Sequence, residues 1–181
     1  DEEIALLNRS DVGLVHCPES NMKLASGVAP VGKFLAAGLR LGLGTDGPAC
    51  NNDLDMIGEM GSAARLHKVA ALDPTLVPAL SVLRMATRGG AEALHMEDRI
   101  GSLEPGKRAD VIVLSLAGPN AMPLFDPFSH VVYSAHAEAV DTVIVEGKVL
   151  MERRRLKTLD VEAIRQKAER YGKKVRRALE S

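Results

Sequence analysis

The sequence predicts an α/β fold in which short apolar strands alternate with helices. Residues 12–15 and 41–43 are two such apolar runs, and a helical stretch at residues 31–39 separates them. Both runs are followed by polar residues, and Asp46 comes shortly after the second. A buried strand that delivers a carboxylate at its carboxyl end is typical of active sites in α/β barrels. We therefore expect a functional site where these two strands end.

Composition excludes several classes of protein. The 181 residues carry a formal net charge of −1, so no overall field favours nucleic acid or an anionic membrane. The chain is 46% hydrophobic and 26% charged, and it has no apolar run near the ~20 residues of a membrane span. No signal peptide is visible, although the chain opens on Asp1 rather than Met. Two cysteines, Cys17 and Cys50, indicate packing residues in a cytoplasmic protein rather than a disulfide framework.

Helices dominate the first hundred residues. Residues 1–8 predict a helix too short to be stable alone, and residues 18–30 predict a loop rich in Pro, Ser, Asn and Gly. From residue 53, apolar residues recur every three or four positions, which predicts a helix that includes His67 as a solvated or hydrogen-bonded side chain. Residues 79–94 predict a second helix, in which Gly89 and Gly90 indicate close packing. His95 follows that helix as a polar terminus.

The remaining residues predict a different kind of structure. Residues 109–114 predict a strand, and residues 141–145 and 148–151 predict a β-hairpin around Glu146-Gly147. Residues 119–128 are Pro-rich and are expected to be irregular; His130 and His136 flank a short apolar run, and we do not expect either to contact a substrate. Residues 160–179 predict an amphipathic helix. Its basic residues suggest nucleic-acid binding, but the compensating acids and the 3% aromatic content argue against it.

The stretch around Asp46 carries the strongest chemical signal. Gly42 and Gly44 alternate with leucines, which predicts a strand face without side chains and room for a ligand or a metal. Gly-Thr-Asp-Gly alone is equally consistent with an ordinary turn. No spacing of the five histidines gives a closed zinc pattern.

Several motifs together resemble the amidohydrolase superfamily. They are HCPESNMKLASG, LGLGTDGPACNN, GSLEPGKRADVIVL and VDTVIVEGKVL, in that order along the chain. The sequence is most similar to metal-dependent aminohydrolases of the methylthioadenosine/S-adenosylhomocysteine deaminase and chlorohydrolase type. The resemblance implies that residues 1–100 are the last two β/α units of a (β/α)₈ TIM-type barrel with the helices that follow them. It also implies that residues 101–155 are strands of a small composite β-sandwich, and that residues 156–181 are a carboxyl-terminal helix.

The same resemblance assigns roles to three residues. Asp46 is expected to be the last metal ligand and the acceptor of a proton from water, and it would also contact the substrate. His16 and Asn21 are expected to contact the substrate or to order the loop over the site. The metal would be one divalent ion, zinc or alternatively iron. The family's His-x-His pair, its further histidine and its proton-donating glutamate have no counterpart here.

The resemblance therefore implies deamination of a purine-type small molecule by a longer protein of which this chain is the carboxyl-terminal portion. We expect the chain alone to be inactive, and to associate with the missing amino-terminal part or with itself. Two alternatives stay open: a chlorohydrolase or other ring aminohydrolase of the same superfamily, and a non-catalytic association module. We expect no nucleic-acid or membrane partner.

Overall fold

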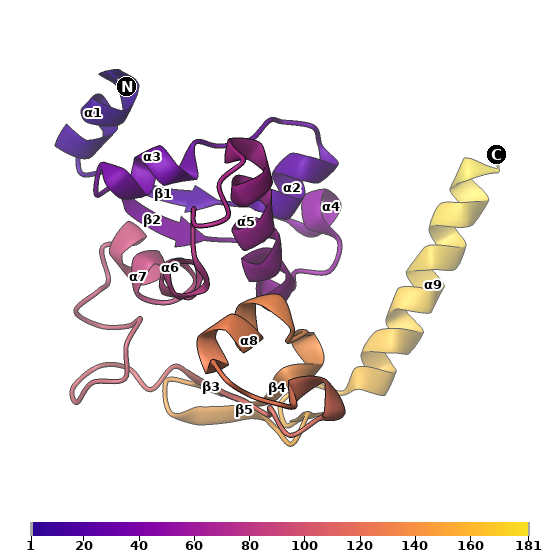
Figure 1. The fold of residues 1–181 in the computed structure, drawn as a ribbon. Coiled ribbons are helices and arrows are strands. Elements are labelled where there is room, and N and C mark those ends of the chain that lie inside the picture. Colours follow the sequence, from indigo (N-terminus) through magenta and orange to yellow (C-terminus); the bar gives the residue numbers. More distant parts are fainter. Residues whose placement is uncertain (1, 181) are drawn as a thin grey trace.

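The computed structural model describes residues 2–180 and confirms an α/β fold (Figure 1). Strands β1 (Gly13–His16) and β2 (Arg40–Leu43) form a two-stranded parallel sheet, with Leu14 opposite Leu41 and His16 opposite Leu43. Helices α2 (Pro18–Lys23) and α3 (Val31–Ala36) connect the two strands. Both strands match the predicted runs to within one residue. The loop expected at residues 18–30 was wrong in part, because α2 begins there with Pro18 at a position that favours helix starts.

One face of this sheet is part of the hydrophobic core. Leu41 and Leu43 are buried together with residues of α5 (Met56–Ala71) and α6 (Ala79–Met85), and Leu14 packs against the same cluster. Because residues paired across parallel strands point to the same face, His16 points toward these helices as well. The helical periodicity predicted from residue 53 onward is confirmed by α5.

The other face of the sheet is partly covered by α7 (Arg88–Ala93). A Cβ atom on Gly13 would lie 1.8 Å from the Ala93 carbonyl oxygen, and one on Gly42 would lie 3.0 Å from the Gly90 Cα. The expected room for a ligand or metal beside Gly42 was therefore wrong, because a helix backbone fills it. Beyond α7 the face opens: Val15 is 55% exposed beside Gly44.

The single helix predicted at residues 79–94 is two helices. Thr87, with φ −126° and ψ −96°, leaves the helical region between α6 and α7, and its hydroxyl donates to the Leu83 carbonyl oxygen at 2.8 Å. A side chain that bonds the preceding turn competes with helix continuation. The break turns α7 onto the sheet, where the predicted close packing of Gly89 is confirmed: its Cβ would lie 2.4 Å from the Leu41 carbonyl oxygen.

The second half of the chain forms a four-stranded antiparallel sheet in chain order. Its strands are β3 (Val111–Leu114), β4 (Val140–Val145), β5 (Lys148–Glu152) and β6 (Arg155–Leu156). The predicted hairpin joins β4 to β5, and Glu146 and Gly147 both have positive φ values, 49° and 77°, as a tight hairpin turn requires. Strand β6 was not predicted.

Helix α8 (Pro127–Tyr133) connects the second sheet to the core (Figure 1). No helix was expected at these residues, although Asp126 is a clear N-cap whose side chain accepts a hydrogen bond from the Phe128 N–H at 2.9 Å. Val131 and Val132 are buried in the main core cluster. Short helical segments also occur at α4 (Pro48–Asn51), η1 (Pro119–Ala121) and η2 (Ala137–Ala139).

Two helices lie outside the core. Helix α1 (Glu2–Arg9) has no buried residue, and α9 (Val161–Leu179) is exposed along its whole length. Figure 1 shows α9 standing away from the rest of the chain. The predicted helix is confirmed, and Asp160 caps it by accepting from the Ala163 N–H at 3.0 Å. Among residues 2–180, no helix combines the length and apolarity that crossing a membrane requires.

Candidate functional site

Asp46 lies beyond the carboxyl end of β2 as an exposed, firmly held carboxylate. The Ser20 hydroxyl donates to its Oδ2 at 2.7 Å, and the Gly47 backbone N–H donates to its Oδ1 at 2.7 Å. These two bonds, followed by one from the Cys50 thiol, hold the pKa of Asp46 below its usual value. The backbone of Asp46 is left-handed, with φ +62°, a conformation that non-glycine residues adopt mainly where the surroundings enforce it. Asp46 is therefore an ionised group in a fixed position.

Helix α2 brings Ser20 to Asp46 because it begins immediately after β1. Its Lys23 Nζ donates to the Ala49 carbonyl oxygen at 2.8 Å and also bonds the Asn52 side chain. Ala49 lies on α4, which follows Asp46 in the chain, and Asn52 ends it. The segments after the two parallel strands are thus tied to each other above the strand ends.

A buried polar network joins α2 and α4 to helix α5. Glu59, on α5, has no exposed surface, and its Oε2 accepts from the Glu19 N–H at 3.2 Å. Its Oε1 accepts from Asn51 Nδ2 at 2.7 Å. Glu19 in turn accepts from the Ser62 hydroxyl at 2.7 Å. Helix α5 thereby holds α2 through Glu19 and α4 through Asn51.

Burial raises the pKa of Glu59 to about 7, and the neighbouring charges of Glu19 and Asp53 add to that rise. The bonds from the Glu19 N–H and Asn51 lower it in part. Sequence reasoning missed Glu59. The available signal was a glutamate one position before Met60, within the predicted apolar helix.

His16 occupies a different environment from Asp46. Its side chain is 4% exposed, and its Nε2 lies 2.9 Å from Nε2 of His67, which is 3% exposed. Burial, followed by the charge of His67, lowers the pKa of His16 to about 4; burial also lowers the pKa of His67. Both rings are neutral at pH 7, so one N–H donates to the other ring. His67 is a hydrogen-bonded helical histidine, one of the two alternatives predicted for it.

Among residues 2–180, no hydrogen bond or ion pair joins His16 to Asp46. Asn21, the third predicted site residue, is half-buried on α2 beside Ser20. The structure shows no hydrogen bond from the Asn21 side chain within the described part of the chain. Asn21 therefore lies near Asp46 in the fold without contributing to the network that holds it.

A complete metal site is not present in the described residues. No group of three or more His, Cys, Asp or Glu side chains among residues 2–180 is arranged to hold a metal ion. Two half-buried thiols are close to the Asp46 segment: Cys50 bonds the Asp46 carboxylate, and burial raises the pKa of Cys17. Asp46 therefore stays the predicted metal ligand, and no further ligands are arranged around it among residues 2–180.

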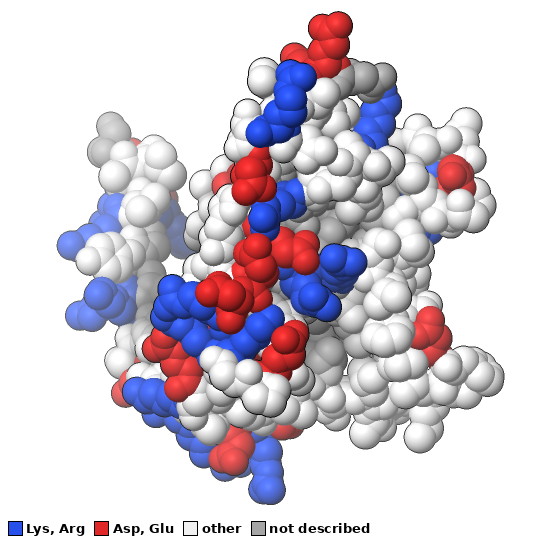
Figure 2. All heavy atoms as spheres, turned by 90° about the vertical axis from the view of Figure 1, so that its left-hand side faces the viewer, with Lys and Arg blue, Asp and Glu red and all other residues white. Residues whose placement is uncertain are grey.

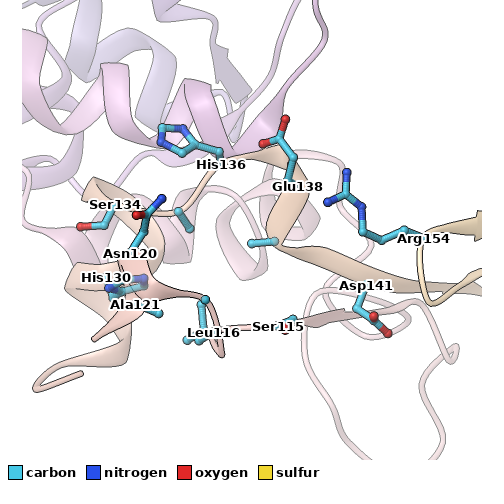
Figure 3. Close-up of a pocket in the computed structure, with 13 residues that line it drawn as sticks. Ser115, Leu116, Asn120, Ala121, His130, Ser134, His136, Glu138, Asp141 and Arg154 are labelled. Carbon is cyan, nitrogen blue, oxygen red and sulfur yellow. The ribbon is translucent and has the colours of Figure 1, made fainter. Parts of the chain in front are cut away.

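A hollow with a volume of about 500 Å³ lies beside the second sheet (Figure 3). Asn120, His130 and Ser134 lie on one side of it, and Glu138, Asp141 and Arg154 lie toward the other. Its lining comes from residues 115–154 and includes none of the three predicted site residues. Charged and polar groups of both signs line it without a hydrogen bond among those six side chains, so the geometry assigns it no chemistry.

Comparison with known proteins places this geometry in context. The profile of the Amidohydrolase family matches residues 1–150. The 5-methylthioadenosine/S-adenosylhomocysteine deaminase of Desulforudis audaxviator is 54% identical over 97% of this chain and 41% of its own length. The protein of the same name from Moorella thermoacetica is 54% identical over 90% of this chain and 38% of its own length.

The chain is also similar to solved structures of zinc-bound proteins. An adenosine deaminase from Xanthomonas campestris with bound zinc matches 97% of this chain and 40% of its own, with 42% identity and a TM-score of 0.93. An atrazine chlorohydrolase from Arthrobacter aurescens complexed with zinc matches 92% of this chain and 37% of its own, with 33% identity and a TM-score of 0.85. The chain spans about two fifths of the length of the relatives it matches.

Proposed function

Because the chain belongs to the amidohydrolase family, we propose that it is the carboxyl-terminal portion of a metal-dependent deaminase acting on methylthioadenosine or S-adenosylhomocysteine. We call the longer protein the parent protein. The identity to deaminases of that name, above 50%, supports this substrate class. The parallel pair β1–β2, with polar residues at its carboxyl end, supports its assignment to the last two β/α units of a barrel. Strands β3–β6 would then contribute to a small sandwich, with α9 as the terminal helix.

The observation that carries the proposal is the environment of Asp46. Deamination adds water to a ring carbon and expels ammonia, so a base is needed to accept a proton from the attacking water. Asp46 is ionised, exposed and oriented by Ser20 and Gly47. We assign it as that base and as the ligand that this portion contributes to the metal site.

The remaining metal ligands would come from the rest of the parent protein, since the described residues do not supply three. Zinc is the metal that the related crystal structures name, with iron as the alternative. We accordingly propose that the chain alone releases no ammonia. The two unbridged cysteines support a cytoplasmic parent protein, and the outer edges of β1 and β2, unpaired within residues 2–180, support association with further chain segments or copies.

Different roles follow for His16 and Asn21. Within the described residues the Asn21 amide makes no hydrogen bond, and it lies on the helix that also positions Asp46, which supports a substrate contact. The His16 ring is engaged by His67 beneath the strands, which supports a positioning role for the β1 end. A chlorohydrolase activity is the second candidate, supported by the atrazine chlorohydrolase structure.

The test is Asp46→Asn in the zinc-loaded parent protein, which keeps the size of the side chain and removes its charge. We expect ammonia release from methylthioadenosine to fall at least ~10²-fold, the usual contribution of a general base. Asp98→Asn, at an exposed aspartate, is the matched control. Turnover unchanged by Asp46→Asn would overturn the assignment, and chloride release from a chlorinated triazine without ammonia release would favour the second candidate.

A further inference from the structure

Helix α9 presents an apolar stripe that no described residue covers. Val161, Ile164, Ala168, Tyr171 and Val175 recur at spacings of three and four, which places them along one face of the helix. Their spacing follows the narrow seam of a helix that packs on a partner. Each is exposed; Ile164 is 50% and Tyr171 58% exposed. A stripe of this kind is normally buried in a folded protein.

The helix is also the basic part of an otherwise acidic chain. Residues 160–180 contain seven Lys and Arg against four Asp and Glu, a formal charge of +3, while the whole chain carries −1. Figure 2, in which α9 is the fainter and more distant column, shows basic side chains along it, whereas both signs mix on the near face. Lys174 lies over the Tyr171 ring, with Nζ 5.8 Å from its centre, at the border of the stripe. The partner surface should therefore be apolar with an acidic rim.

The placement of α9 is shared with a longer protein of known structure. The zinc-bound adenosine deaminase from Xanthomonas campestris matches 97% of this chain with a TM-score of 0.93. The unmatched 3% corresponds to about five of 181 residues, fewer than the 19 of α9, so the match includes most of this helix. In that protein, 60% of the chain lies outside the matched part and is available to hold a helix in this position.

We propose that the apolar stripe of α9 is the docking face for the part of the parent protein that lies outside this sequence. The inference rests on the proposed function only in taking this chain as a portion of a longer protein. A helix standing free of its own domain would sample many orientations, and the shared placement indicates that other residues fix it. The 60% of the longer chain that lies outside the match is the occupant that this similarity offers for the stripe, and a second copy or a membrane would be distinguished from it by the test.

The test compares this chain alone with the parent protein by hydrogen–deuterium exchange. We expect the amides of residues 164–175 to exchange at least about 100-fold more slowly in the parent protein, because docking adds to the free energy of opening the helix. Equal exchange in both proteins would overturn the proposal.

Paired variants separate docking from general effects on the helix. Ile164→Asp with Tyr171→Asp places two charges on the stripe, and Gln166→Asp with Lys173→Asp changes the opposite face at least as strongly in charge. We expect the stripe pair to lower the melting temperature of the parent protein and leave that of the chain alone unchanged, with little effect from the control pair in either. Stripe-dependent dimerisation of the chain alone, seen by sedimentation, or stripe-dependent binding to phosphatidylserine vesicles, would assign the face to another occupant and overturn the proposal.

Hydrogen exchange at α9 and ammonia release test the docking face and the proposed function separately. Slow exchange at α9 in a parent protein that releases no ammonia would leave the docking face standing and reject the deaminase. Ammonia release by a parent protein in which the α9 amides are not protected would support the deaminase and reject the docking face.

Discussion

The two sheets of this chain differ in how completely they are buried, and the candidate site lies at the end of the more buried one. The β1–β2 sheet has one face in the core, and α7 covers the start of its other face. The β3–β6 sheet has no fully buried residue, and Ile112 and Val113 of β3 are 53% and 47% exposed. Asp46 follows a strand of the first sheet, which has the packing to fix a side chain. The second sheet retains surface for other chain segments.

This contrast predicts different responses to substitution, with the largest effect expected at Gly13 of β1. Gly13→Ala would place a Cβ 1.8 Å from the Ala93 carbonyl oxygen, so β1 and α7 must separate. We expect a loss of about 3 kcal/mol or more in the free energy of unfolding, measured by denaturant titration. Gly118→Ala, where a Cβ would meet no atom within 4 Å, is the matched control and should be near neutral. A mild effect at Gly13 would mean that the first sheet is as loosely covered as the second.

The sequence could predict elements whose signal is local. The hairpin at Glu146-Gly147, the strand before Asp46 and the helix capped by Asp160 each have turn or capping residues beside a clear apolar pattern. The break at Thr87 was not predicted, because a threonine can bond the carbonyl four residues earlier within a continuous helix, and the packing of α7 against Gly13 and Gly42 involves another segment.

The site shows the same division. Asp46 could be singled out because it follows a strand and belongs to a motif shared with a known family. Glu59 and the His16–His67 contact could not, because they depend on which side chains meet after α5 packs beneath the strands. From the sequence, Glu59 is a polar residue within an apolar helical pattern. Its burial could be inferred only once its partners, Glu19 and Asn51, are known.

The second prediction concerns Glu59. Because its pKa is raised from 4.5 to about 7, the folded state binds a proton more tightly than the unfolded state, and the resulting stability is lost as pH rises through 7. Lowering the pH from 7 to 5 should therefore stabilise the fold through this group by about 2 kcal/mol.

Glu59→Gln removes that gain and places an amide group opposite two hydrogen-bond donors. We expect the variant to be less stable than wild type by a margin that is larger at pH 5 than at pH 7, measured by urea unfolding. A margin independent of pH would show that Glu59 is not protonated in the fold.

The third prediction concerns His16, whose titration has the opposite sign. Its pKa is lowered from 6.5 to about 4, so the unfolded state binds the proton more tightly, and stability is lost as pH falls from 6.5 toward 4. The expected loss between pH 7 and pH 5 is just under about 2 kcal/mol, which nearly offsets the gain from Glu59. His16→Gln, which retains a polar side chain opposite His67, should lose less stability than the wild type when the pH falls from 7 to 5, because only His67 of the buried pair then titrates. If acid destabilised this variant as steeply as Glu59→Gln, the buried pair would not be the source of the acid sensitivity.

The smallest effect is expected in α9, the least covered element of the chain. A Cβ on Gly172, inside this helix, would meet no atom within 4 Å, and glycine in a helix interior costs about 1 kcal/mol relative to alanine. Gly172→Ala should therefore increase helicity, measured by circular dichroism. Since α9 has no buried residue, that gain should not reach the cooperative unfolding of the core, and the main melting temperature of the chain alone should stay the same. A rise in that melting temperature would show that α9 is coupled to the two sheets in the isolated chain. In that case the contrast with the buried β1–β2 sheet would hold for the second sheet and not for α9.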